Sequence, residues 1–239
     1  MRRSLFTLGA LAAAGMVMSL FASGAYANPT CSSTTTVTSG QGILASTLIN
    51  PNGTSSGLCI SAGDKVFGNF TNPSDNLPLT GTVSWLFGAS PGAVTLTATT
   101  AVSGPIVATF DYEVAVLPSF AALGWRIDDL EKDFTLNNVG GTATADLAGV
   151  TVPPTNPPVA IDCTRHSPPQ AGDTCPATAT FAPVTDLTID ETLTANASSR
   201  IGALVDTISQ VNVAPEPASL GLLGTGLLGL GLLARRRRR

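Results

Sequence analysis

The side chains that could do chemistry are few in this chain. Carboxylates gather in residues 128–133 (Asp-Asp-Leu-Glu-Lys-Asp) and again at Asp190 and Glu191. Two carboxylates can act as acid and base in glycoside hydrolysis, and clustered oxygen ligands suit calcium. Residues 128–133 lack the glycine and the spacing of an EF-hand loop, and an acidic run of this kind is typical of a solvated turn. We therefore expect no catalytic or metal site there, and keep a secreted polysaccharide-active enzyme as the alternative.

A single histidine, His166, lies between Cys163 and Cys175. Thiolates and imidazole bind zinc, but three ligands at this spacing match no closed zinc module. A serine or cysteine hydrolase would need His166 as its base, and the chain has no phosphate-binding loop of the Gly-x-x-x-x-Gly-Lys-Ser/Thr type. We predict that the protein is not an enzyme and that it holds no metal or other cofactor.

The N-terminus has the three parts of a secretory signal peptide. Two arginines follow the first methionine, residues 5–21 are apolar or small, and Ala25-Tyr26-Ala27 fits the small-x-small pattern before a cleavage point. We expect residues 1–27 to be removed, so that the mature protein begins at Asn28. An uncleaved N-terminal anchor is the alternative, and in both cases the middle of the chain is exported.

The C-terminus also consists of three consecutive parts. Pro215, Glu216 and Pro217 come first, and residues 218–234 then carry no ionisable side chain and are mostly leucine and glycine. The chain ends in five arginines, Arg235, Arg236, Arg237, Arg238 and Arg239. A helix over residues 218–234, at about 1.5 Å per residue, spans roughly 25 Å, which is enough for a short transmembrane helix. Because arginines are retained on the cytoplasmic side, we expect them to anchor this helix while the prolines hold an extended segment outside the bilayer.

These three parts, in this order and spacing, resemble the PEP-CTERM sorting signal, which is found on exported proteins of Gram-negative bacteria that make extracellular polysaccharide. The resemblance covers residues 214–239. It implies that Pro215, Glu216 and Pro217 are recognised by an exosortase, a membrane transpeptidase-like enzyme that cuts near this motif. It also implies a precursor anchored in the inner membrane and a product at the cell surface or outside the cell.

The four cysteines, Cys31, Cys59, Cys163 and Cys175, all lie in the part that would be exported. Disulfides persist in the oxidising periplasm, and four cysteines allow three pairings. Locality favours Cys31 with Cys59 and Cys163 with Cys175. The first bond would close the N-terminal segment onto the sheet, and the second would staple a loop that carries an exposed His166.

Residues 28–214 form the predicted exported domain. These 187 residues hold five basic and 15 acidic side chains, a net charge of −10. Such a surface argues against nucleic acid and anionic lipid as partners, since both gain affinity from lysines and arginines that neutralise phosphates. The domain is long enough to bury a real core.

Composition and periodicity favour an all-β domain, and we expect an antiparallel, jelly-roll-like β-sandwich. Thr, Val and Ala are common, and Gly, Pro, Asn and Ser recur roughly every eight to twelve residues. Alternation is clearest in residues 106–116, where Phe110, Tyr112, Val114 and Val116 share one face. The other expected strands are 65–70, 82–87, 94–97, 134–136, 141–147, 178–181, 186–196 and 210–213, with a short helical turn within 43–49.

Two further segments bear on the organisation of the domain. Residues 63–70 (Gly-Asp-Lys-Val-Phe-Gly-Asn-Phe) resemble an Asp-Lys-x-Phe-x-x-Phe pattern of many PEP-CTERM ectodomains, which implies that Phe67 and Phe70 anchor the core and that Asp64 forms a turn. Residues 152–158 contain four prolines, which is typical of a linker or a surface loop. A domain boundary there would leave only about 56 residues, a marginal size for a core. We therefore expect one sandwich in which the last strands, within 178–213, pair with the first.

Two classes of function follow from these features. The protein is expected to be a non-enzymatic surface or matrix component, processed by an exosortase and embedded in the extracellular polysaccharide of a biofilm, where it adheres or binds glycan. The alternative is a secreted polysaccharide-active enzyme that uses an acidic pair. Sugar sites stack aromatic side chains on pyranose faces, so both glycan interpretations require Trp85, Trp125 and Tyr112 to be exposed rather than packed in the core.

Overall fold

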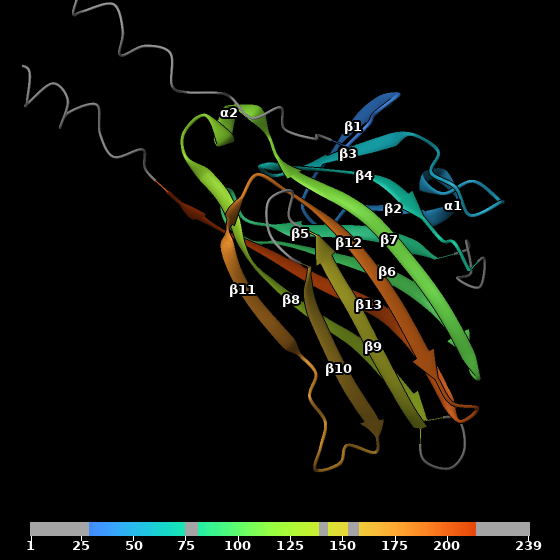
Figure 1. Ribbon diagram of the computed structural model, residues 1–239. Helices are drawn as coiled ribbons and strands as arrows, with labels where there is room; N and C mark the ends of the chain where they lie inside the picture. Colours follow the sequence, from blue (N-terminus) through green and yellow to red (C-terminus); the bar gives the residue numbers. More distant parts are fainter. Residues whose placement is uncertain (1–28, 75–80, 139–142, 153–157, 214–239) are drawn as a thin grey trace, which may run out of the picture.

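The computed structural model describes residues 29–74, 81–138, 143–152 and 158–213 of the 239-residue chain. Within these ranges the chain forms two β-sheets and two one-turn helices, α1 (Ala45–Leu48) and α2 (Pro118–Ala121). The two sheets lie face to face as two layers (Figure 1). The all-β prediction is confirmed, whereas the predicted signal segment and the predicted transmembrane helix lie outside the described residues.

The larger sheet has seven strands and the smaller sheet has six. In spatial order, the seven-stranded sheet contains β1 (Ser33–Val37), β3 (Leu58–Ala62), β4 (Lys65–Thr71), β7 (Ile106–Val116), β12 (Asp186–Ala195), β9 (Ala143–Val152) and β10 (Val159–Ser167). The six-stranded sheet contains β11 (Ala177–Val184), β8 (Trp125–Asn138), β13 (Ser199–Asn212), β6 (Val94–Ser103), β5 (Thr82–Phe87) and β2 (Gly42–Leu44).

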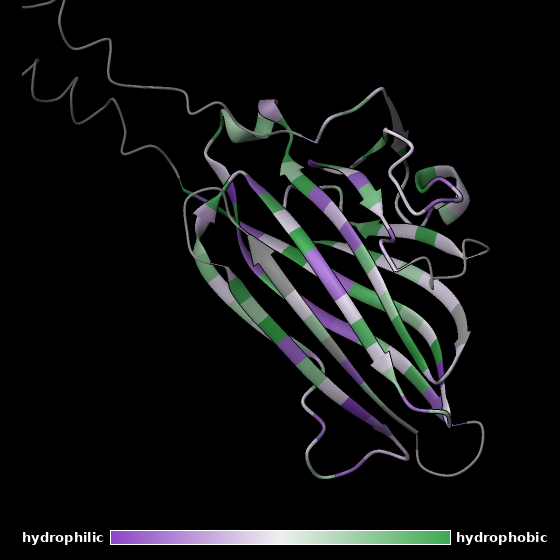
Figure 2. Cartoon of the chain, turned by 45° about the vertical axis from the view of Figure 1, so that its right-hand side comes forward, coloured by the Kyte–Doolittle hydropathy of each residue, from purple (hydrophilic) through white to green (hydrophobic). Residues whose placement is uncertain are grey.

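Alternation of side chains puts one face of each long strand in the core. In β7, Phe110, Tyr112 and Val114 are at most 1% exposed, whereas Thr109 and Glu113 remain partly exposed. Figure 2 shows the same exchange of hydrophobic and hydrophilic residues along the long strands. This is the pattern of a strand with one face in the core and the other towards solvent.

An aromatic group forms one part of the core between the sheets. Phe67 and Phe70, both expected as core anchors, are fully buried and pack with Trp85, Phe110 and Tyr112. The ring centroids of the contacting pairs lie 5.5 to 6.3 Å apart. Since Trp85 comes from β5 and the other four rings from β4 and β7, these contacts join the two sheets.

The last two strands lie in the middle of the two sheets. β12 pairs with β7 and β9, and β13 pairs with β6 and β8. The expectation that they pair with the first strands was wrong, because β1 and β2 are short strands at the sheet edges. A strand of 14 residues such as β13 can satisfy its backbone groups only beside other long strands.

One pair among the described strands, β1 with β3, is parallel rather than antiparallel. Residues 38–57, which connect the two strands, pass through β2 and α1 before the chain returns. A parallel pair needs such a crossover of a dozen or more residues. The other described pairs are antiparallel, and the jelly-roll-like connectivity stays a prediction.

Sequence periodicity missed β1, β2, β3 and β10, and most of β6, β8 and β13. The expectation of a solvated turn at residues 128–133 was wrong, because β8 runs straight through them. Charged residues flank the buried Leu130 and Phe134 and obscure the two-residue period. Residues 153–157 of the proline-rich stretch lie outside the described residues, and the strands on either side of them, β9 and β10, pair with each other.

We predict that Phe70→Ala lowers the free energy of unfolding by about 3–5 kcal/mol, since it removes a ring from a packed aromatic group. Leu86→Ala is the matched control, because Leu86 is 64% exposed and its loss should change stability by at most about 0.5 kcal/mol. Urea unfolding, followed by tryptophan fluorescence, measures both. Equal unfolding midpoints for the two variants would contradict this packing.

Candidate functional sites

The predicted sorting motif follows closely on the last strand. Pro215, Glu216 and Pro217, and the predicted cytoplasmic anchor at residues 235–239, lie outside the described residues. The last described residue is Val213, whose backbone N–H donates to the Gly124 carbonyl at 2.8 Å. The domain is therefore described up to the segment where the motif begins.

Both disulfides join the cysteines that sequence locality favours. Cys31 bonds to Cys59 with a Cα–Cα distance of 5.5 Å, and Cys163 bonds to Cys175 with a Cα–Cα distance of 4.9 Å. The first bond fastens the segment before β1 to β3. The second joins the middle of β10 to the loop that precedes β11.

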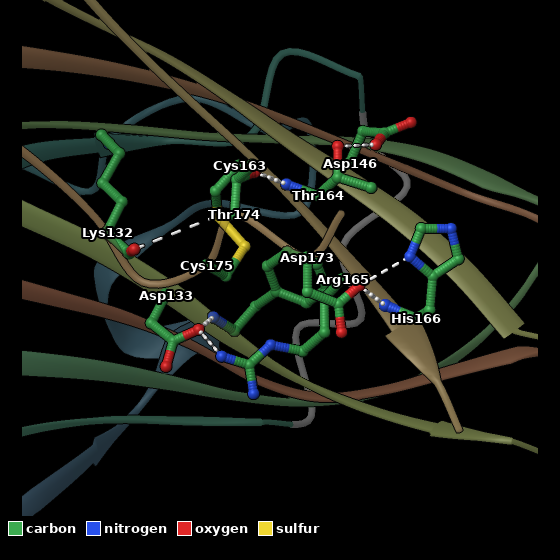
Figure 3. The surroundings of a disulfide bond; sticks show 11 residues. Lys132, Asp133, Asp146, Cys163, Thr164, Arg165, His166, Asp173, Thr174 and Cys175 are labelled. Carbon is green, nitrogen blue, oxygen red and sulfur yellow. Dashed lines mark hydrogen bonds and ion pairs between the residues drawn. A yellow bond between two sulfur atoms is a disulfide. The ribbon is translucent and has the colours of Figure 1, made fainter. Parts of the chain in front are cut away.

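The loop closed by Cys163 and Cys175 is fixed by polar contacts as well as by the disulfide (Figure 3). His166 is 22% exposed, so the expectation of an exposed histidine was wrong. Its Nδ1 lies 2.6 Å from Asp173 Oδ1, and its backbone N–H donates to the same oxygen at 3.0 Å. The hydrogen bond from His166, aided by backbone N–H groups, holds the pKa of Asp173 below its usual range.

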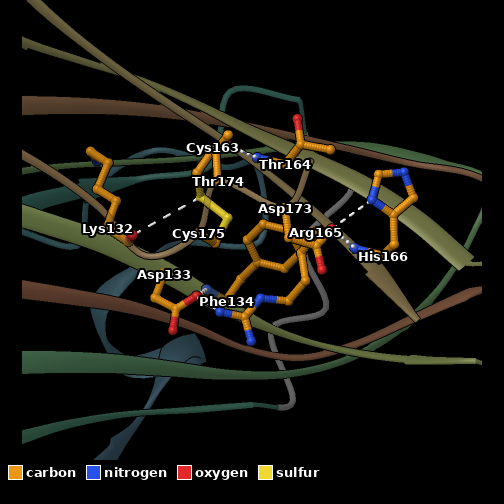
Figure 4. Close-up of polar contacts among 10 residues, drawn as sticks. All are labelled: Lys132, Asp133, Phe134, Cys163, Thr164, Arg165, His166, Asp173, Thr174 and Cys175. Carbon is orange, nitrogen blue, oxygen red and sulfur yellow. Dashed lines mark hydrogen bonds and ion pairs between the residues drawn. A yellow bond between two sulfur atoms is a disulfide. The ribbon is translucent and has the colours of Figure 1, made fainter. Parts of the chain in front are cut away.

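Arg165 on the same strand is held from two sides. Its Nη2 donates to Asp133 Oδ1 at 2.5 Å, and its guanidinium carbon lies 5.9 Å from the centre of the Phe134 ring (Figure 4). Asp133 and Phe134 belong to β8 of the other sheet. The side chain of Arg165 therefore connects β10 of one sheet to β8 of the other, beside the disulfide.

The arrangement of this loop does not suit a metal ion. The sulfur atoms of Cys163 and Cys175 bond to each other, so neither is a thiolate ligand. Across the described ranges, no group of three His, Cys, Asp or Glu side chains is placed to hold a metal. The histidine and aspartate instead stabilise the backbone of the loop.

Of the acidic residues considered for hydrolysis, Asp190 and Glu191 do not form a facing pair on the surface. Asp190 is exposed, but Glu191 is 1% exposed and points into the core, since neighbours along a strand face opposite sides. Trp85 and Tyr112 are buried in the core, and Trp125 is partly buried. The residues that a stacked sugar would need are thus mostly engaged in packing.

Glu191 belongs to a group of four polar side chains between the sheets, here named the buried polar cluster. Tyr112 and Glu191 come from β7 and β12 of the larger sheet, and Lys132 and Asp206 come from β8 and β13 of the smaller. Each of the four residues is at most 1% exposed. Lys132 Nζ donates to Glu191 Oε1 and lies 3.7 Å from Asp206 Oδ1, and the Tyr112 hydroxyl donates to Asp206 Oδ2 at 2.6 Å.

A glycine makes room for the lysine in this cluster. A Cβ atom added to Gly149 of β9 would lie 2.4 Å from Cε and 2.8 Å from Nζ of Lys132. Real Cβ atoms do not approach so closely, so the lysine stem occupies the space that a side chain at Gly149 would fill. The position of Lys132 is therefore set by the strand opposite it as well as by its own.

The ionisation of the cluster follows from its burial. Burial and the nearby Asp206 carboxylate raise the pKa of Glu191 to about 8, against the opposing effect of the Lys132 ammonium. Burial alone would lower the pKa of Lys132, but Asp206 and Glu191 outweigh it and raise that pKa. Glu191 Oε2 and Asp206 Oδ1 are buried without a hydrogen-bond donor. A proton shared by the two carboxyl groups would satisfy both atoms and leave one negative charge beside the ammonium.

This cluster was not among the expected sites, although the sequence carries a signal for it. Each member lies between two large apolar residues at a spacing of two, which is the period of a strand face. The four triplets are Phe110-x-Tyr112-x-Val114, Leu130-x-Lys132-x-Phe134, Ile189-x-Glu191-x-Leu193 and Leu204-x-Asp206-x-Ile208.

A second buried ion pair lies in the turn between β3 and β4. Lys65 and Asp64 are 0% and 3% exposed, and Lys65 Nζ donates to Asp64 Oδ1 at 3.0 Å and to the Gly92 carbonyl at 2.6 Å. The Gly92 N–H and Gln210 Nε2 both donate to Asp64 Oδ2. Asp64 is in the turn, as expected, and it also joins that turn to the β5–β6 loop and to β13. Burial lowers the pKa of Lys65, although the Asp64 carboxylate opposes this effect.

Comparison with known protein families identifies the PEP-CTERM protein-sorting motif in residues 213–239. The chain is therefore an exported protein that carries a signal for an exosortase. This signal indicates that export passes through a membrane-anchored precursor. No curated protein matches the chain. Within the described parts of the chain, no helix has the length and apolar character needed to cross a membrane.

We expect Asp64→Ala to lower the free energy of unfolding by about 3–5 kcal/mol, because it leaves the Lys65 ammonium buried without its carboxylate. Urea unfolding near neutral pH measures this loss. Asp162→Ala, at an exposed position of β10, is the control and should leave stability within about 0.5 kcal/mol of the unaltered protein. A similarly small effect for Asp64→Ala would show that the buried pair contributes little.

The His166–Asp173 contact predicts a pH dependence. Because the folded protein lowers the pKa of Asp173, its contribution to stability is present above the pKa of the unfolded chain and is lost as pH falls through the folded value. Asp173→Asn should therefore be less stable than the unaltered protein at neutral pH, and the difference should vanish in acid. Urea midpoints measured from neutral pH downwards, with Asp162→Asn as control, test this. A difference that does not change with pH would contradict it.

Proposed function

We propose that this protein is a non-enzymatic structural or adhesive component of the cell surface or extracellular matrix, embedded in extracellular polysaccharide after exosortase processing. The observation that carries the proposal is a sorting motif joined directly to a disulfide-bonded β-domain. In this domain the ionisable groups most suited to chemistry are buried in the core. The exported domain is acidic and rich in threonine, and these properties favour a soluble, hydrated module.

The end of the domain from which the signal leaves supports a membrane-held precursor. Leu123, Val211 and Val213 are 63%, 37% and 47% exposed, and residues 117–124 contain no charged side chain. Anionic lipid would repel most of an acidic domain, but this end, where Arg126 lies opposite Val211 and donates to the Ala121 carbonyl, can approach a bilayer. The predicted membrane segment begins at residue 218, only a few residues beyond Val213.

The polysaccharide-active alternative has less support. It requires an accessible acidic pair beside an exposed aromatic side chain, and Asp190 and Glu191 lie on opposite faces of β12. Trp85 and Tyr112, two of the three aromatic residues named for glycan contact, are in the core. Hydrolysis of the host's own polysaccharide by the purified domain, lost in Asp190→Asn, would favour the enzyme over the structural component.

Processing is tested by intact-mass analysis of protein from the envelope and the medium of the host, with and without its exosortase. We expect a loss of mass that corresponds to residues after Pro217 or nearby, in the strain that has the enzyme. Glu216→Gln should reduce processing because it alters the motif, whereas Asp190→Asn, the same kind of change at an exposed position of the domain, should not. Full-length tails in both strains would contradict the proposal.

A further inference from the structure

The buried polar cluster brings together the groups needed to form an amide bond between two strands. Lys132 of β8 and Asp206 of β13 lie opposite each other in the strand register, with Nζ 3.7 Å from Asp206 Oδ1. A second carboxyl group, that of Glu191, accepts a hydrogen bond from the same nitrogen. We propose that Lys132 and Asp206 form an intramolecular isopeptide bond, and that Glu191 moves the protons of this reaction.

Each member of the cluster has a position that fits one role. Lys132 Nζ is the nucleophile and the carboxyl carbon of Asp206 is the acceptor. The Tyr112 hydroxyl donates to Asp206 Oδ2 at 2.6 Å, so it polarises the acceptor and stabilises the charge that develops on this oxygen during attack. Glu191 contacts the nucleophile directly, which is the geometry of a general base that later acts as an acid.

The reaction balances without any added reagent. Glu191 passes one proton from the Lys132 ammonium to Oδ1 of the Asp206 carboxylate, and the free amine attacks Cγ of Asp206. Glu191 then passes a second proton from the nitrogen to the departing Oδ1 hydroxyl and returns to its starting state. A carbon–nitrogen bond forms, a carbon–oxygen bond breaks, and one water molecule leaves. Neither oxidation nor reduction occurs.

The surroundings favour this outcome. All four residues are at most 1% exposed, and an ion buried in an apolar interior carries a large desolvation penalty. The amide replaces one positive and one negative charge by a neutral group. The partners are also held opposite each other on adjacent strands of one sheet, which gives the reaction a high effective concentration. Glu191 has a pKa raised to about 8, which suits a group that exchanges protons near neutral pH.

A second buried lysine provides an internal control. Lys65 also contacts a carboxylate, that of Asp64, at 3.0 Å. Its nitrogen donates to the Gly92 carbonyl rather than to a second carboxyl group, and no tyrosine hydroxyl donates to Asp64 among the described contacts. We therefore expect Lys65 to keep a free amine.

The test is mass spectrometry of the full chain purified after export, unfolded and with its disulfides reduced. The expected mass is lower by one water molecule than the sequence of the recovered chain requires, once peptide mapping has located its two ends. Trypsin should cleave after Lys65 but not after Lys132, and the peptide that contains Lys132 should be joined to the peptide that begins at Ile201. An unshifted mass together with normal cleavage after Lys132 would overturn the proposal.

Variants identify the three roles in the same assay. Lys132→Met removes the nucleophile, and Glu191→Gln keeps the hydrogen bonds but removes the proton carrier, so both should show the full, unreacted mass. Asp206→Asn can still react by releasing ammonia, and its product should have the same mass as the reacted unaltered protein. Retention of the water loss in Lys132→Met would overturn the assignment, and the measurement on the unaltered chain decides the proposal even if a variant does not fold.

Discussion

The structure depends on the mutual stabilisation of one lysine and two carboxyl groups that are buried between two apolar sheet faces. An isolated charge in such an interior is strongly unfavourable, so Lys132, Glu191 and Asp206 are stable there only as a group. Their strands come from both sheets, and the group therefore ties the relative position of the sheets to one hydrogen-bonding arrangement. A sandwich held by apolar contacts alone could slide by small steps, whereas this one has a defined register across its core.

Strands with a simple apolar period could be predicted from the sequence. Residues 82–87 and 106–116 coincide with β5 and β7, because their inward positions are apolar and most of their outward positions are polar. β8 could not be recognised in this way, since Lys132 occupies an inward position among outward carboxylates. The partners of each strand were also beyond prediction, because pairing depends on the lengths of strands far apart in the chain.

The sites also differ in how far they could be predicted from the sequence, according to how close together their residues lie in the chain. The sorting signal is local, since its parts are consecutive, and a family comparison finds the same segment. The disulfides are nearly local, and the pairing that locality favours is the one in the structure. The buried polar cluster is not local, because Tyr112 and Asp206 are joined only by the folded sheets. The signal in the sequence was a polar residue at an inward position between two apolar ones. Four such residues occur in this chain, and the folded sheets bring them together in one site.

These features describe an exported module that uses its ionisable side chains mainly on itself. Asp64 joins a turn, a loop and a strand, Asp173 fixes the disulfide loop, and Glu191 and Asp206 neutralise a lysine in the core. Beyond the membrane a protein has oxidising conditions and no cytoplasmic repair, so internal bonds of this kind are a physical basis for persistence in a matrix. Exposed carboxylates such as those of Asp146, Asp162 and Asp190 face the solvent and keep the domain hydrated.

The most direct test of this description is carbodiimide-dependent labelling of carboxyl groups in the native protein, located by peptide mass spectrometry. Asp162 and Asp190, which are exposed, should react at once, whereas Glu191 and Asp206 should stay unlabelled while the protein is folded. Labelling of Glu191 in the native state, at a rate similar to that of Asp190, would show that the cluster is open to solvent and would contradict a closed, self-contained core.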